Sequence, residues 1–226
     1  MVQEQMSDDS FFREVNEEIR KDQAKALWDS YGPAAIALAV LIVLATAAYV
    51  AYDYWVETRA NRSGDAFSQA LTLANDGKND EALGALQELE KDGYGAYPIL
   101  ARMRAATVMA AKGDYAAAVA GFDAVAKDNS IPASIRDMAS LRAAFILVDN
   151  GSYADVSARA EALTADGNTL RHSAREALAL SAWKEGRSSD ALKLFEQISS
   201  DDAAPRNARE RATMLAELIR GSGVSS

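Results

Sequence analysis

The residues that could do acid–base or metal chemistry are few in this chain and lie far apart. His172 is the only histidine among the 226 residues, and there is no cysteine. Transition metals bind clusters of His, Cys, Asp or Glu at short spacing, and the sequence around His172 holds no such cluster. Its place beside Arg171, near the start of an expected helix, favours a surface or capping histidine. The sequence therefore predicts no metal and no other cofactor.

Pairs of carboxylates occur, but not where catalysis could use them. Glu88 and Glu90 form one such pair and Asp201 and Asp202 another. General acid or base chemistry needs a desolvated cleft that separates two pKa values, and these pairs fall on solvated helices or loops. The Gly-Tyr-Gly run at 93–95 lacks the lysine and the following helix of a phosphate-binding loop. We expect no enzymatic activity.

Binding chemistry is better represented. Arginine forms paired hydrogen bonds with carboxylates, and the first helices of repeat proteins line a concave face. The candidates for contact with a partner are Arg102, Arg104, Arg136 and Arg142. An adaptable apolar groove could be formed by Tyr94, Tyr97, Met103 and Met109. Solvated charges or internal ion pairs, and ordinary core packing, remain the alternatives for these two sets.

The composition indicates an all-α protein. Four prolines interrupt the chain, and Ala, Leu, Glu, Lys and Arg fill long stretches with few consecutive β-branched residues. The net charge is −9, and residues 1–30 carry 4 basic and 8 acidic side chains, leaving 20 and 25 for the rest. Because both parts are acidic, a nucleic acid is not an expected partner.

One segment is long and apolar enough to span a membrane. Ser30 to Tyr52 contains no charged residue, and its apolar core is about 30 Å long as a helix. Tryptophan and tyrosine flank both ends, as they do at membrane interfaces. The residues expected to contact lipid are Pro33, Ile36, Leu38, Val40, Leu41, Ile42, Val43 and Leu44. A cleaved signal peptide and a buried core helix are the alternatives.

The basic residues favour one orientation. Four of them precede the span and two follow it within a comparable length, namely Arg13, Arg20, Lys21 and Lys25 against Arg59 and Arg62. Cytoplasmic flanks carry the excess of lysine and arginine. The amino terminus is therefore predicted to be cytoplasmic and the long carboxyl-terminal part to lie across the membrane.

The remainder of the chain is repetitive. Four glycines, Gly77, Gly113, Gly151 and Gly186, are separated by 36, 38 and 35 residues, close to a tetratricopeptide period. Small and bulky apolar residues recur at fixed distances from them. Together these residues are predicted to pack the repeats: Ala70, Gly77, Ala82, Ala106, Gly113, Ala118, Phe122, Ala144, Gly151, Ala179, Gly186, Ala191 and Phe195.

The glycine turns predict where helices end. Gly113 and Gly151 are expected to be left-handed and to precede short polar caps, whereas Gly77 and Gly186 are expected to form looser turns. We predict helix pairs over 63–91, 97–127, 133–164 and 169–199, followed by a capping helix over 205–220.

Together, the span and the repeats resemble a known family. A single span, the aromatic run Tyr-Asp-Tyr-Trp at 52–55 and the segment Gly-Asp-Tyr-Ala-Ala-Ala at 113–118 resemble the ancillary Sec-translocon subunits of the bacterial inner membrane. The resemblance implies a periplasmic repeat domain beside the protein-conducting channel, which binds proteins such as the translocon and periplasmic chaperones. It supplies no catalytic residues.

The resulting prediction is an all-α chain in three parts. Residues 1–30 form a tail with an amphipathic helix, one face of which presents Phe11, Phe12, Val15, Ile19 and Ala26. Residues 31–55 form the anchor. Residues 56–226 form a tetratricopeptide-like α-solenoid of about four helix pairs and a capping helix. The expected function is a protein-binding scaffold of the translocon. A structural organiser of the envelope or of cell division is the alternative.

Overall fold

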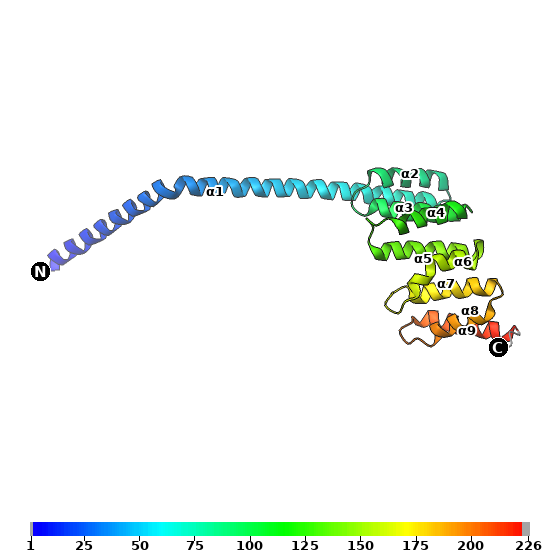
Figure 1. Ribbon diagram of the computed structural model, residues 1–226. Helices are drawn as coiled ribbons and strands as arrows, with labels where there is room; N and C mark the ends of the chain where they lie inside the picture. Colours follow the sequence, from blue (N-terminus) through cyan, green and yellow to red (C-terminus); the bar gives the residue numbers. More distant parts are fainter. Residues whose placement is uncertain (1, 223–226) are drawn as a thin grey trace. The chain divides into compact units, whose positions relative to one another are not determined.

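The protein is helical throughout the part described. A computed structural model describes residues 2–222, with side chains for residues 15 and 17–222. Within these residues the elements run in the order α1 (Val2–Asn75), α2 (Asn79–Asp92), α3 (Tyr97–Ala111), α4 (Tyr115–Lys127), α5 (Ala133–Asn150), α6 (Tyr153–Ala160), the 3-10 turn η1 (Glu161–Thr164), α7 (Arg171–Lys184), α8 (Ser188–Ser199) and α9 (Arg206–Gly221) (Figure 1). The all-α prediction is confirmed for these residues.

The chain divides into two units, Met1–Thr58 and Arg59–Ser226, and α1 contributes to both. Each unit is described by itself. The predicted boundaries after residues 30 and 55 stay predictions. The side chains of Phe11 and Phe12, on which the amphipathic tail depends, lie outside the described residues.

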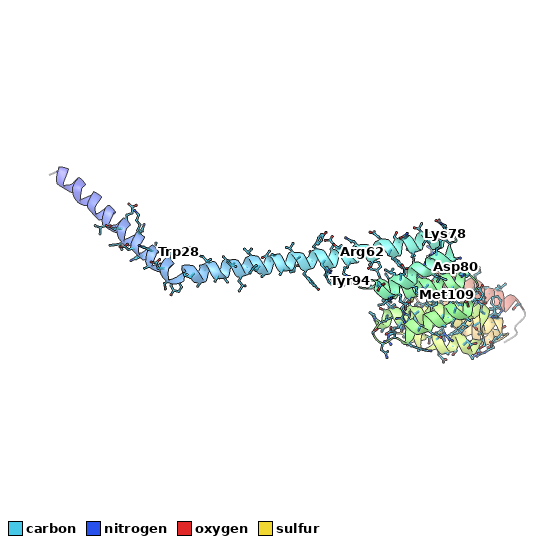
Figure 2. The ribbon with its side chains drawn as sticks, turned by 90° about the horizontal axis from the view of Figure 1, so that it is seen from above. Trp28, Arg62, Lys78, Asp80, Tyr94 and Met109 are labelled. Atoms are coloured by element: carbon cyan, nitrogen blue, oxygen red, sulfur yellow. The ribbon has the colours of Figure 1, made fainter. Side chains whose placement is uncertain are left out.

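The first unit contains the candidate membrane span. Within α1 an apolar stretch is long enough to cross a membrane, and none of its side chains is buried (Figure 2). Leu41 and Leu44, for example, are 62% and 65% exposed. Thr46 donates its hydroxyl hydrogen to the carbonyl oxygen of Ile42 at 2.8 Å, so this polar group is already satisfied. Pro33 lies inside the helix and supplies no amide hydrogen.

The second unit is built from small cores that follow one another along the chain (Figure 1). The end of α1 shares a core with α2 and α3, and the next core joins α3, α4 and α5. A third core joins α5, α6 and α7, and a fourth joins α7, α8 and α9. Each core therefore uses consecutive helices, which is the arrangement of a repeat array.

Most of the alanines and phenylalanines predicted to pack the repeats lie in these cores. All the alanines and phenylalanines of that set are at most 2% exposed: Ala70, Ala82, Ala106, Ala118, Phe122, Ala144, Ala179, Ala191 and Phe195. An alanine between two helices lets their backbones approach closely. Gly121 acts in the same way, because an added Cβ atom there would lie 3.1 Å from the Cβ atom of Ala106.

Three of the four predicted glycine turns are left-handed. Gly77, Gly113 and Gly186 all have positive φ angles, of 78°, 84° and 77°. At each of them the next residue donates its amide hydrogen back to the carbonyl five residues before it, as from Asp114 to Met109 at 3.0 Å. The caps after them differ as predicted, because Asp114 accepts from the amide of Ala117 at 3.1 Å whereas Lys78 and Arg187 make no side-chain cap, so the turns at Gly77 and Gly186 are the looser ones.

Gly151 was also predicted to be left-handed, and this is wrong. Its φ is −137° and its backbone is extended. The amide of Gly151 donates to the carbonyl oxygen of Leu147 at 2.8 Å, and the ammonium of Lys184 on α7 donates to the carbonyl oxygens of Val148 at 2.9 Å and Asp149 at 2.7 Å. A side chain from the following repeat thus satisfies two of the carbonyls that the end of α5 leaves open.

The last helix, α9, covers the end of the array, but its outer face is not entirely polar. On its inner face α9 buries Ala212, Ala216 and Ile219 against the preceding helices. On its outer face Met214 and Leu218 are 69% and 56% exposed among the charged residues.

Candidate functional site

A groove opens across the first helices of three successive repeats. It has a volume of about 410 Å³ and is formed by the end of α1, by α3 and by α5. The lining residues are Phe67, Leu100, Met103, Arg104, Thr107, Ser134, Ile135, Met138 and Arg142. The groove is therefore largely apolar, with two guanidinium groups and two hydroxyl groups as its polar side chains.

The helical period explains why these side chains meet. Leu100 and Arg104 are four residues apart on α3, and Met138 and Arg142 are four apart on α5. Residues at this spacing lie on one face of a helix. In both helices the apolar residue stands 13 residues and the arginine 9 residues before the turn glycine of the same repeat. The two pairs therefore occupy equivalent positions of neighbouring repeats.

The two arginines of the groove are only weakly engaged by the protein itself. Arg104 donates from Nη2 to Oδ1 of Asn75 at 3.3 Å, and its buried Nε has no hydrogen-bond partner among the described residues. Arg142 is exposed and makes no hydrogen bond or ion pair within the described part of the chain. Both guanidinium groups have donors that remain available for a ligand.

The other two predicted arginines are not brought into the groove. Arg102 donates from Nη1 to Oδ2 of Asp128 at 2.7 Å and lies 3.8 Å from Glu90. Arg136 donates from Nη1 to Oδ1 of Asn129 at 2.8 Å. These guanidinium groups have structural partners, so only half of the predicted set lines the groove.

The environment of Asp128 shows how firmly Arg102 is held. The hydroxyl of Ser130 donates to Oδ1 of Asp128 at 2.6 Å, while Arg102 donates to its other oxygen. These hydrogen bonds, with Ser130 contributing most, lower the pKa of Asp128 to about 2. The carboxylate is ionised at any physiological pH and keeps its hold on the arginine.

Of the apolar residues predicted to form a groove, the structure again places only some in its lining. Met103 lines the groove, whereas Tyr94, Tyr97 and Met109 do not. The ring of Tyr97 packs against that of Phe67, with 6.0 Å between the centroids. The backbone amide of Tyr94 donates to the hydroxyl oxygen of Ser63 at 2.9 Å, near Arg62 at the same end of the domain (Figure 2).

Sequence reasoning missed the residues that complete the groove: Phe67, Leu100, Thr107, Ser134, Ile135 and Met138. The repeated apolar residue four positions before an arginine was a usable signal, because it occurs at the same place in two repeats.

His172 was predicted to lie at the surface or to cap a helix, and this is wrong. It is buried in α7, with Nε2 3.5 Å from Oδ2 of Asp201. Burial lowers the pKa of the imidazole, and the charges of Arg171 and Arg175 lower it further, while Asp201 acts in the opposite direction. No cluster of three or more metal-ligating side chains surrounds it or any other site within the described residues.

The comparison with protein families agrees with this architecture. Residues 25–176 match the family described as a tetratricopeptide repeat-like domain. No curated protein and no solved structure matches the chain. Repeat domains of this kind are protein-interaction modules and are as a rule not catalytic. Because the match covers well over half of the 226 residues, the chain belongs to the tetratricopeptide repeat-like domain family.

Proposed function

We propose that this protein is a membrane-anchored scaffold that holds a segment of another protein in the groove between α1, α3 and α5. The observation that carries the proposal is the groove itself, with its apolar floor and two arginines that the chain does not neutralise. Its volume of about 410 Å³ is sufficient for a few side chains of a bound peptide.

The chemistry of the groove supports binding rather than turnover. Its lining residues include no carboxylate, no histidine and no cysteine, all of them being described residues. Proton transfer at neutral pH usually depends on one of these groups, and the hydroxyls of Thr107 and Ser134 have no base beside them in the lining. Membership of the tetratricopeptide repeat-like family likewise favours a protein-binding scaffold.

The exposed apolar stretch of α1 supports an anchor. Leaving so many large aliphatic side chains in water is unfavourable by about 25 cal/mol for each Å² of apolar surface. A bilayer would cover that surface along its whole length. In this proposal residues 31–55 are the span, the amino terminus is cytoplasmic, and the repeats lie in the periplasm of a bacterium.

A more specific role follows from the resemblance in architecture. One span followed by a tetratricopeptide-like domain is the arrangement of the ancillary Sec-translocon subunits. We propose that the anchor holds the groove beside the translocon, where a bound segment would come from a translocon subunit, from an envelope chaperone or from an emerging client.

The test is site-specific photo-crosslinking in native membranes. The full-length protein carries p-benzoyl-phenylalanine at Met138 in the groove or, as the matched control, at Ala124, an exposed residue of α4 outside the groove lining. Mass spectrometry then identifies what each position captures. We expect translocon subunits and envelope chaperones from Met138 and not from Ala124.

Two outcomes would overturn parts of this proposal. Equal captures from both positions, or none from either, would show that the groove is not the binding surface. Capture of division or envelope-structural proteins at Met138, with no translocon subunit, would replace the export role with that of a structural organiser.

A further inference from the structure

The groove carries information about the chemistry of its ligand. Its polar lining is unbalanced, because Arg104 and Arg142 contribute two positive charges and the described lining residues contribute no negative charge. The protein as a whole is acidic, with a net charge of −9, so this positive lining is not a consequence of the general composition. An apolar surface with two uncompensated arginines favours an apolar ligand that carries negative charge.

This unbalanced lining is confined to the two middle repeats. The positions that correspond to Leu100 and Arg104 are Gly64 and Ser68 in the first repeat. In the fourth repeat they are Ser173 and Ala177. Neither of these repeats presents an apolar residue followed by an arginine. The array therefore offers one such site, defined by the tandem pair on α3 and α5.

The tandem arrangement places two guanidinium groups along one groove. Arg104 of α3 and Arg142 of α5 both line it, and both helices pack on α4. A bound segment that carries two carboxylates can therefore pair with both arginines. Apolar side chains between the carboxylates would contact the floor formed by Phe67, Met103 and Met138.

We infer that the groove binds an extended protein segment in which apolar residues are flanked by two carboxylates. The inference rests on the proposed function, and it specifies the class of segment that the scaffold takes. Each carboxylate pairs with one guanidinium, from Arg104 or Arg142, while the apolar residues bury against the floor. The flexible thioethers of Met103 and Met138 allow the floor to accept different aliphatic side chains.

The experiment measures the binding of fluorescein-labelled ten-residue peptides to the full-length protein in detergent micelles by fluorescence anisotropy. One peptide carries the core Asp-Leu-Leu-Asp and a second the isosteric core Asn-Leu-Leu-Asn. A third, with Asp-Ser-Ser-Asp, keeps the charge and removes the apolar residues. We expect the first to bind roughly tenfold more tightly than either of the others, and less tightly as salt is added.

Variants assign the effect to the groove. Arg142→Gln and the double variant Arg104→Gln/Arg142→Gln should reduce the preference for Asp-Leu-Leu-Asp over Asn-Leu-Leu-Asn, the double variant abolishing it. Arg142→Lys should retain most of it. Arg206→Gln is the matched control, because Arg206 is an exposed arginine of α9 paired with Glu210. Because Arg142 is exposed, its single variants should fold even if the double variant does not.

Several results would overturn the inference. These are equal binding of the acidic and amide peptides, no binding of any peptide, and a preference that is as large in the Arg142→Gln variant as in the unchanged protein. Binding of phosphatidylglycerol vesicles that needs both arginines, without peptide binding, would assign the groove to lipid. If peptide binding fails while Met138 still crosslinks translocon subunits, the scaffold function stands and only the ligand chemistry is wrong.

Discussion

At the scale of single residues, the surroundings of His172 determine its protonation state. Neither ring nitrogen has a hydrogen-bond partner among the described residues, and the ring lies in α7 close to Arg171 and Asp201. Burial penalises the charged imidazole more than Asp201 favours it, so the pKa in the folded protein is below the ordinary 6.5. The neutral form is the one that the fold accommodates.

This environment predicts a pH dependence of stability. Because the pKa is depressed on folding, the unfolded chain binds more protons, and stability is lost as the pH falls below 6.5. Urea unfolding of the full-length protein in micelles, followed by circular dichroism at pH 7.5 and 5.5, should show a lower free energy of unfolding at pH 5.5. In His172→Gln the difference between the two pH values should be smaller. An unchanged difference would contradict the role given to His172.

Ala118 makes a second prediction at this scale. It is fully buried on α4, where a larger side chain has no room. Ala118→Leu should lower the free energy of unfolding by about 1–3 kcal/mol through overpacking. Ala120→Leu on the same helix is the matched control, because Ala120 is exposed and should change stability by less than about 0.5 kcal/mol. Equal effects of the two substitutions would refute the packing role of Ala118.

At the scale of elements, side chains from neighbouring repeats stabilise helices and join them. Arg159 of α6 forms paired bonds with Asp123 of α4, at 2.9 Å from Nε and 2.7 Å from Nη2. Lys184 of α7 binds carbonyls at the end of α5 in the repeat before it. A repeat therefore depends on its neighbour for polar as well as apolar contacts.

The Lys184 contact can be removed with little change in the length of the side chain. Lys184→Met keeps much of the aliphatic chain but leaves the carbonyls of Val148 and Asp149 without their charged donor. We expect a loss of about 1 kcal/mol in the free energy of unfolding, since the site is partly open to water. Lys193→Met on α8, an exposed lysine, is the control and should be close to neutral. Amide hydrogen exchange should show faster opening at the end of α5 only in the first variant.

At the scale of the whole molecule, the proposal requires that the span lies in a lipid bilayer while the repeats lie in water. Small consecutive cores need no long-range contact to form, so the repeats can fold next to a membrane without involving the anchor. In the proposal, the candidate span, which has no buried side chains in the structure, would be covered by lipid.

This organisation predicts the behaviour of a truncated chain. The full-length protein should resist extraction from membranes by alkaline carbonate, whereas a variant that lacks residues 31–55 should be released. Alkaline phosphatase fused to the carboxyl terminus should be active with the full-length protein and inactive with the truncated one, because the enzyme folds only outside the cytoplasm. An active fusion in both cases, or in neither, would contradict the predicted orientation.

The sequence alone determined the features that depend on local pattern. The glycine spacing and the small residues around it pointed to helical repeats because helix packing needs small residues at fixed positions. The apolar length of residues 30–52 marked the candidate span because whether a helix can cross a bilayer depends on its length and composition. Neither inference required knowledge of which helices contact one another.

Tertiary structure decided which side chains are free and which are engaged. The local sequence does not show which arginine has an internal partner, yet Arg102 is paired with Asp128, 26 residues away, and Arg142 is not paired within the described residues. Lys184 reaches the carbonyl of Val148 across 36 residues, beside the extended Gly151. His172 is buried, with Asp201 from the connection between α8 and α9 beside it. Burial and pairing depend on partners brought together by folding, and no local pattern specifies those partners.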